Sequence, residues 1–389
     1  MRRVAVVGIG QTKFGEMWEA SLRDLVTEAG MKSLMDCTVK GEEIGGLYVG
    51  TMASGQFVGQ ELIAPMVLDA AGLADLHIPT THVEGAGASG AMAFRQAYLA
   101  VASGMIDVAV AGGVEKTTDV SDREVGRILG AASDQEWEAF LGATDTALHA
   151  LVARSHMDRY GTTRNHLAAV AVKNHRNGAK NKYAHFQREI TMEAVLSSAP
   201  VAEPLHVLDA APISDGAAAV VLVPWDRARS YSKRPVEVLA SGQGSDYLSL
   251  AARDDLTSFA ATKAAAERAY KQAKLEPKDI DLLEVHDAFT INEIISLEDL
   301  GFCKPGQGGP FVASGKADVG GALPVNPSGG LKARGHPLGA TGIAQVVETA
   351  RQLRGQANGL QVKDARVGMT CNMGGTGVVS VVHILGAGQ

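Results

Sequence analysis

The chain has 389 residues, a formal net charge of −7 and 46% hydrophobic residues. This length suits two domains of ordinary size, each with a buried core. The negative charge argues against nucleic acid as a partner, and no apolar run is long enough for a membrane helix. The three cysteines are widely spaced, which favours a reducing, cytoplasmic compartment over a disulfide framework.

Short β-rich runs alternate with longer helical ones along the chain, which is typical of an α/β fold. The first half begins with a helical stretch at 21–36 and a strand at 43–50. It continues with a strand, a glycine-rich turn, a helix and a further strand, at 81–84, 85–90, 91–103 and 107–111.

A second set of elements repeats this order. It comprises a helix at 261–273, a strand at 279–286, a turn at 326–342, a helix at 343–354 and strands at 366–370 and 378–385. At a constant offset, Ile44 matches Ile280 and Val49 matches Val285. Four elements in the same order predict an internal duplication.

A long segment at 117–212 separates the two halves. It contains helical patterns of its own, which are typical of a lid or flap rather than a bare loop. Strand character returns at 213–222 and closes the first half. We therefore expect an N-terminal half at 1–116 and 213–232, an inserted loop domain at 117–212, and a C-terminal half at 233–389.

Three glycine-rich loops in the second half carry side chains suited to proton transfer at carbon. His286 ends a strand, His336 precedes a helix, and Cys371 stands before a run of small residues. A thiol can move a proton to or from carbon, and imidazole N–H groups can hold the resulting enolate oxygen. The structural alternatives are a strand-end His, a turn His and a buried small hydrophobe. The small residues after Cys371 can also point several backbone N–H groups at one anion.

Together these motifs resemble those of the thiolase superfamily, most closely the archaeal and bacterial branch near the sterol-carrier-protein thiolases. The run 286–289 resembles that branch's His-Asp-Cys-Phe motif, with Ala288 in place of the cysteine. The runs 326–330 and 335–342 resemble the family's Gly-His-Pro block. Cys371 stands in the last motif, where many thiolases have an acid/base cysteine and this branch often has His-Asn.

The resemblance implies two similar α/β halves packed as a five-layer α-β-α-β-α sandwich, and at least a homodimer. It also implies coenzyme A thioesters as substrates, with no metal and no tightly bound cofactor. In this branch the thiolase often associates with a small zinc-ribbon/OB-fold subunit that helps hold coenzyme A, so we expect such a partner. We expect substrate contacts from Ala288, Phe289, Asn326 and Gly330.

One position departs from the family pattern. The family reads Cys-Ala-Ser-Gly at the start of the first buried helix, whereas this chain reads Gly-Ala-Ser-Gly at 87–90. A cysteine there would be activated by the helix dipole and a nearby His and then acylated. Gly87 cannot be acylated. Its backbone N–H, with that of Met373 or Gly374, is still expected to form an oxyanion hole.

Three explanations of Gly87 stay open: a laboratory variant made to trap substrate, an enzyme that works without covalent acylation, and a scaffold subunit that has lost catalysis. The surviving set of His286, His336 and Cys371 favours the second explanation. In that hypothesis Cys371 transfers the proton at the α-carbon, while His336, assisted by His286, binds the enolate oxygen.

We therefore expect a thiolase-like acyltransferase that makes or cleaves 3-oxoacyl-CoA thioesters. Gly87 and Ala288 leave room near the reacting carbon, which favours a bulky or aromatic acyl group such as that of benzoylsuccinyl-CoA. The alternatives are retro-aldol cleavage of 3-hydroxyacyl-CoA thioesters and coenzyme A binding without turnover.

Overall fold

The computed structural model describes residues 1–388, and its main sheet has nine strands in the order β3-β2-β4-β7-β1-β8-β11-β10-β9. A separate ribbon pairs β5 (Pro200–Ala202) with β6 (Leu205–His206). The strands of the main sheet are β1 Val4–Gln11, β2 Gly46–Gly50, β3 Thr80–Val83, β4 Ala109–Glu115, β7 Gly216–Pro224, β8 Val236–Ser245, β9 Leu282–Glu284, β10 Val367–Gly374 and β11 Val379–Ala387.

The helices follow the strands in the alternation that the sequence predicts. They are α1 Leu22–Met35, α2 Ser54–Phe57, α3 Ile63–Ala70, α4 Ser89–Ser103, α5 Asp122–Gly130, α6 Asp145–Tyr160, α7 Arg164–Gly178, α8 Met192–Leu196, α9 Trp225–Tyr231, α10 Ala260–Ala273, α11 Thr290–Asp299, α12 Gly308–Ala313, α13 Gly330–Arg334 and α14 Leu338–Leu353. Gly104 ends α4 in the left-handed conformation, with φ 86°.

The two halves have the same topology, so the predicted duplication is confirmed. From the centre outwards, β1, β7, β4, β2 and β3 correspond to β8, β11, β10, β9 and a short parallel bridge between Leu283 and Val325. In both halves the outer strands are parallel and the inner ones antiparallel. The strand predicted at 279–286 is shorter, because 277–279 forms a 3₁₀ turn and the chain leaves the sheet after Glu284.

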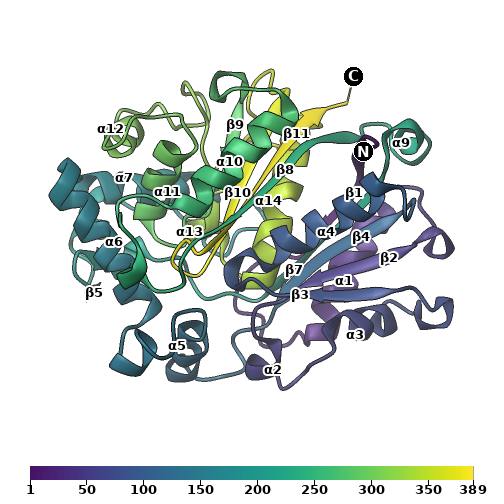
Figure 1. The fold of residues 1–389 in the computed structure, drawn as a ribbon, viewed down its shortest axis with the longest axis horizontal. Coiled ribbons are helices and arrows are strands. Elements are labelled where there is room, and N and C mark those ends of the chain that lie inside the picture. The colour runs from purple at the N-terminus through teal and green to yellow at the C-terminus, as the bar shows by residue number, and fades with distance from the viewer. Residues whose placement is uncertain (389) are drawn as a thin grey trace.

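Three apolar cores hold five layers together, as the resemblance implies. One core packs α1 and α3 on the outer face of the first half-sheet. The central core joins α4 and α14 to strands of both halves, and Phe94 and Ile343 lie fully buried within it. The third core packs α10 and α11 on the outer face of the second half-sheet. Figure 1 shows the two groups of strands, with α14 between them.

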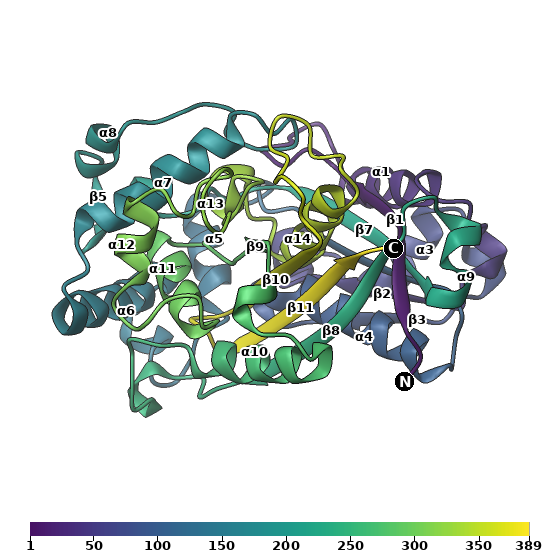
Figure 2. The ribbon, with the colours of Figure 1, turned by 90° about the horizontal axis from the view of Figure 1, so that it is seen from above.

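The segment between β4 and β7 carries α5, α6, α7 and α8 together with the β5–β6 ribbon. Its helices α6 and α7 lie beside α11 and α12 of the second half, as Figures 1 and 2 show from two directions. This segment therefore covers one end of the second half-sheet. Among residues 1–388, no helix combines the length and the apolar character needed to cross a bilayer.

The two central helices bring their amino ends together, and this positions the site. A Cβ placed on Gly90 would lie 2.3 Å from the carbonyl oxygen of Gly339, so only glycine allows this approach. The loop before α4 and the loop before α14 therefore lie side by side. The segment 210–213 rests against the second-half loops: the Ala211 N–H donates to the Ala288 carbonyl at 2.8 Å, and Ile213 bridges to His336.

Candidate active site

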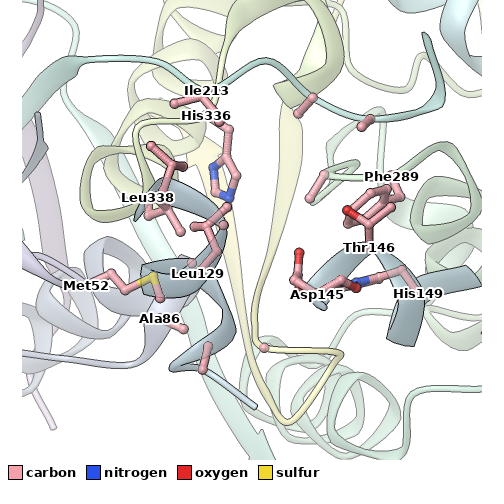
Figure 3. Close-up of a pocket in the computed structure, with 18 of the residues that line it drawn as sticks. Met52, Ala86, Leu129, Asp145, Thr146, His149, Ile213, Phe289, His336 and Leu338 are labelled. Carbon is pink, nitrogen blue, oxygen red and sulfur yellow. Dashed lines mark hydrogen bonds and ion pairs between the residues drawn. The ribbon is translucent and has the colours of Figure 1, made fainter. Parts of the chain in front are cut away.

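A cavity of about 250 Å³ lies where these loops meet. Loops before α4 and α14, the end of β10 and the inserted helices α5 and α6 all contribute to its walls (Figure 3). Most of the lining is apolar. The lining residues are Met52, Ala86, Gly87, Thr117, Val125, Gly126, Leu129, Ala132, Thr144, Asp145, Thr146, His149, Ala210, Ala211, Pro212, Ile213, His286, Ala288, Phe289, His336, Leu338, Met373 and Gly375.

His286 stands in the loop that follows β9 and is buried. The side-chain amide nitrogen of Asn372 donates to its Nδ1 at 2.9 Å. With the amide in this orientation the neutral ring carries its proton on Nε2, while the buried Asn372 Oδ1 has no partner within residues 1–388. Burial, followed by the neighbouring His336, lowers the pKa of His286 well below the ordinary value. His286 is therefore a neutral hydrogen-bond donor.

His336 stands in the loop between α13 and α14. Its Nδ1 lies 2.7 Å from the hydroxyl of Thr341, and that hydroxyl donates its own proton to the Pro337 carbonyl at 2.9 Å. The hydroxyl can thus only accept from the ring, which places the proton on Nδ1 and leaves Nε2 with a free lone pair. Burial lowers the pKa of His336 to about 4, so at neutral pH the ring is an unprotonated base.

The structure therefore brings two imidazoles with opposite tautomers into one cavity. Their ring centroids are 5.0 Å apart and their planes are perpendicular. His286 offers an N–H group and His336 offers a lone pair. An acid/base group beside a donor is the arrangement needed to form and hold an enolate.

Gly87 lines the same cavity, between the ends of β3 and α4. A Cβ at this position would lie 2.9 Å from Cε1 of His286 and 2.9 Å from the carbonyl oxygen of Met373. Such contacts are tighter than a side chain tolerates without movement of its neighbours. The imidazole of His286 thus fills the space in which a nucleophilic side chain at position 87 would lie.

The expectation that Cys371 joins the two imidazoles is not met. Asn372 points to His286, and alternate residues of a strand point to opposite faces. Cys371 is accordingly fully buried in the core beneath α10 and is not part of the cavity lining. Burial, followed by the charge of Asp299, raises the pKa of its thiol to about 12, so the sulfur is an inert thiol at neutral pH.

The other two cysteines also lie outside the cavity lining. Burial raises the pKa of Cys37, and burial with the charge of Glu298 raises that of Cys303 to about 11. Within residues 1–388, then, no thiol lines the cavity. Nor do those residues bring together three or more His, Cys, Asp or Glu side chains in a way that could hold a metal ion.

Of the backbone donors predicted for an oxyanion hole, Gly87 and Met373 line the cavity and Gly374 does not. Met373 presents its carbonyl oxygen towards Gly87. Gly374 packs instead against the loop before α4, since a Cβ there would lie 2.1 Å from the Gly85 carbonyl oxygen. Gly375 takes its place in the lining.

The predicted substrate contacts divide into two pairs. Ala288 and Phe289 line the cavity as expected, whereas Asn326 and Gly330 do not. Asn326 is buried, and its amide spans the Val285 N–H at 2.8 Å and the Glu293 carboxylate at 2.8 Å. Its side chain therefore fixes the segment that leads from β9 to His286, and it does not face the cavity.

Gly330 likewise supports the His286 loop. A Cβ there would lie 2.4 Å from Asp287, whose carboxylate accepts from the backbone N–H groups of Leu331 at 2.7 Å and Lys332 at 3.2 Å. Asp287 thereby caps the amino end of α13 and ties the His286 loop to the chain that leads to His336. Burial, followed by the charge of Glu293, raises the pKa of Asp287 to about 6.

Sequence reasoning missed two polar residues of the cavity, Asp145 and His149, both in the first turns of α6. His149 Nδ1 lies 2.9 Å from the Asp145 carbonyl oxygen, and its ring stacks on Phe289 with centroids 4.4 Å apart. The spacing of an acid and a His four residues apart after the Thr144 cap was the available signal. Only the packing of α6 against the second half turns it towards the site.

Comparisons with known proteins agree with this architecture. Residues 4–226 match the family described as thiolase, N-terminal domain, and residues 242–387 match the thiolase C-terminal domain-like family. An acetyl-CoA acetyltransferase of Methanothermobacter thermautotrophicus is 53% identical over 384 residues, covering 99% of both chains. The benzoylsuccinyl-CoA thiolase subunit BbsB of Thauera aromatica is 35% identical, covering 96% of this chain and 95% of that protein.

Among solved structures, the Ltp2–ChsH2(DUF35) aldolase superimposes with a TM-score of 0.86 at 30% identity. The match covers 99% of this chain and 98% of that chain. By their names, these relatives include an acyltransferase, a thiolase subunit and an aldolase.

Proposed function

Because this chain belongs to the thiolase family, we propose that it makes or breaks a carbon–carbon bond beside the thioester carbonyl of an acyl-CoA. It does so without an acyl-enzyme, by retro-aldol cleavage of a 3-hydroxyacyl-CoA or by the reverse reaction. The observation that carries the proposal is the pair of neutral imidazoles with opposite tautomers in a cavity whose described lining has no thiol.

The chemistry follows from what each ring offers. His336 Nε2 takes the proton of the 3-hydroxyl, C3 becomes a carbonyl, and the C2–C3 bond breaks. The bonding electrons pass to the thioester as an enolate, whose oxygen accepts from the Nε2–H of His286 and the backbone N–H of Gly87. Protonated His336 then returns the proton to C2. The products are an aldehyde or ketone and a shortened acyl-CoA, with no other reactant consumed.

Aldol chemistry is favoured over Claisen chemistry by what each reaction needs. Claisen cleavage transfers an acyl group and so requires a nucleophile to receive it. Position 87 supplies none, and a Cβ there would lie 2.9 Å from the His286 ring and 2.9 Å from the Met373 carbonyl oxygen, so a side chain would force these neighbours to move. Retro-aldol cleavage requires only a base and an oxyanion site. The solved aldolase relative supports this choice at 30% identity over nearly the whole chain.

A second candidate is a thiolase reaction in which the thiol of free coenzyme A attacks the ketone of a 3-oxoacyl-CoA directly. The acetyl-CoA acetyltransferase relative, at 53% identity, favours it. The same two imidazoles would serve, with His336 Nε2 taking the thiol proton. The cavity of about 250 Å³, with Ala288 in its lining, offers space for the acyl group in either reaction.

We also propose that the protein is at least a homodimer and works with a small zinc-ribbon/OB-fold subunit that helps hold coenzyme A. In the solved relative, Ltp2 is paired with ChsH2 (DUF35). Activity should therefore be assayed both with and without such a subunit.

The test is a panel of matched 3-hydroxyacyl-CoA and 3-oxoacyl-CoA thioesters, with and without free coenzyme A. Cleavage of the 3-hydroxy compounds without free coenzyme A, with release of an aldehyde or ketone, is the expected result. Cleavage of only the 3-oxo compounds, strictly dependent on free coenzyme A, would establish the second candidate instead.

Exchange of the C2 protons of a simple acyl-CoA in D₂O measures enolate formation apart from cleavage. We expect exchange in the natural chain and its loss in His336→Ala. A chain that binds acyl-CoA but shows neither exchange nor cleavage, with the partner subunit supplied, would be a scaffold, and the proposed function would be wrong.

A further inference from the structure

The cavity contains a polar pair that the proposed reaction does not use. Asp145 and His149 lie on α6, on the side of the cavity opposite His336 (Figure 3). They come from the inserted segment, whereas the reacting imidazoles come from the second half. A substrate that fills the cavity from His336 to its far wall would therefore meet this pair.

Asp145 is the one carboxylate among the described residues that line the cavity, and those residues include no Lys or Arg. The surrounding wall is mostly apolar, with Leu129, Ile213 and Phe289 among its larger members. The Asp145 side chain is 28% exposed, so solvent screens its charge in part. Its influence reaches across the cavity, since Asp145 acts to raise the pKa of His336, against the larger effect of burial.

His149 adds a second acceptor to the same wall. Its Nδ1 lies 2.9 Å from the Asp145 carbonyl oxygen and 3.4 Å from the Asp145 carboxylate oxygen Oδ1, and both oxygens only accept. Nδ1 therefore carries the proton of the neutral ring, and Nε2 is left as an acceptor. Stacking on Phe289 holds the ring in place. The polar atoms that this pair has available are thus acceptors, which suit a hydroxyl and oppose an anion.

Asp145 could also serve only to stabilise α6, since an acid in the first turn of a helix interacts favourably with the helix dipole. Asp122 in α5 has that role, with a capping box at Ser121 and no place in the cavity lining. Asp145 differs because it lines the cavity.

We propose that Asp145 sets the substrate class of this site. The cavity accepts acyl groups that are uncharged or carry a hydroxyl, and it discriminates against acyl groups that bear a second carboxylate. This inference rests on the proposed function, because it requires an acyl-CoA to enter the cavity. It separates this protein from relatives whose substrates are succinyl thioesters, and it removes benzoylsuccinyl-CoA from the expected substrates.

The test compares the binding of butyryl-CoA and succinyl-CoA, which differ by a carboxylate in place of a methyl group. Dissociation constants are measured by calorimetry, with the partner subunit supplied throughout, on the natural chain, Asp145→Asn and Asp122→Asn. We expect the natural chain to bind succinyl-CoA at least about tenfold more weakly, because two like charges across an apolar cavity repel each other. Asp145→Asn should bring the ratio close to one, and Asp122→Asn should leave it unchanged.

Equal affinities in the natural chain, or an undiminished preference in Asp145→Asn, would overturn the role of Asp145 and leave the proposed reaction standing. Failure of both thioesters to bind would overturn the proposed function and this inference together. Neither readout depends on turnover, so the two failures can be told apart.

Discussion

The rings of His286 and His336 meet edge to face, with centroids 5.0 Å apart and planes at 90°. Each ring has one nitrogen bound by a neighbour, Asn372 for His286 and Thr341 for His336. The free nitrogens therefore differ in kind: one carries a proton and the other a lone pair. The proposed reaction uses this difference, with His286 as the donor and His336 as the base at neutral pH.

His336→Ala should reduce turnover by about 10²–10⁴-fold while leaving acyl-CoA affinity nearly unchanged, because it removes the base and not the binding cavity. Thr341→Val should cause a smaller loss, since Nδ1 no longer has an acceptor that fixes the tautomer. Steady-state kinetics with separate binding measurements checks both. Thr349→Val on the same helix is a matched control, because its hydroxyl has no partner within residues 1–388. Equal losses in the two Thr variants would contradict the tautomer argument.

The dependence of activity on pH follows from the lowered pKa of His336. A base with a pKa of about 4 stays unprotonated as the pH falls from 8 to 5, so kcat/KM should be flat over that range. An ordinary His base would lose activity near pH 6.5. A decline centred near pH 6.5 would mean that another group, or an unshifted His336, is the base.

The lowered pKa of His336 also predicts how the stability of the protein depends on pH. The folded-state pKa of His336 lies below its ordinary value of 6.5, so the unfolded chain binds more protons between pH 4 and 6.5. Stability of the natural chain relative to His336→Gln should therefore rise as the pH increases through this window. Urea unfolding of both chains at several pH values measures the difference, and a parallel pH dependence of the two would refute it.

Adding a side chain at position 87 should damage the site rather than restore a thiolase. In Gly87→Ala and Gly87→Cys, the new Cβ meets the His286 ring and the Met373 backbone carbonyl. We expect about 1–3 kcal/mol of destabilisation and loss of C2 proton exchange. Thermal unfolding and exchange in D₂O measure these effects. A gain of acetoacetyl-CoA thiolysis in Gly87→Cys would show that the site tolerates a nucleophile there.

Cys371→Ala should retain full activity, because its sulfur lies in the core on the far face of β10 from Asn372. The substitution should cost about 1–2 kcal/mol in the free energy of unfolding, for the buried volume removed. The native thiol should also react very slowly with alkylating reagents at neutral pH, since burial raises its pKa to about 12. A large loss of turnover with normal stability would place Cys371 in the mechanism after all.

Asp287→Asn should destabilise the protein and lower turnover together. The amide would bring a donor to a site where the carboxylate now accepts from Leu331, Lys332 and the Asn174 side chain. We expect a loss of about 1–3 kcal/mol for the backbone donors left without a partner, and displacement of the His286 loop. Asp281→Asn, at an exposed site that also accepts two backbone N–H groups, is the control. Its activity should be unchanged.

The sequence predicted more of the fold than of the site. The repeated order of helix and strand indicated the duplication, because each half must bury the same faces to form its core. The periodic spacing of apolar residues likewise indicated the two central helices, close to the bounds that the structure gives them. These properties are local and periodic, so they can be read from neighbouring residues.

The site residues divide differently. The motifs predicted His286 and His336 for the site, and the resemblance implied a nucleophile at the position where Gly87 stands. Asn326 and Gly330 were expected to contact the substrate because they lie in the same motif block as His336. In the structure both residues support the loop that carries His286 and lie outside the cavity lining. A motif places residues near one another in the sequence. It does not show which of their side chains face the cavity and which support the loops behind it.

Composition, repeat and motif by themselves thus determined an α/β duplication with two histidines and no nucleophile at its centre. Only the tertiary structure decided which face of β10 meets His286, and so placed Asn372 in the site and Cys371 in the core. It alone also brought Asp145 and His149 of α6 to the cavity. The physical reason is that strand and helix periods fix relative directions along one element, while the packing between distant elements fixes which direction faces the cavity.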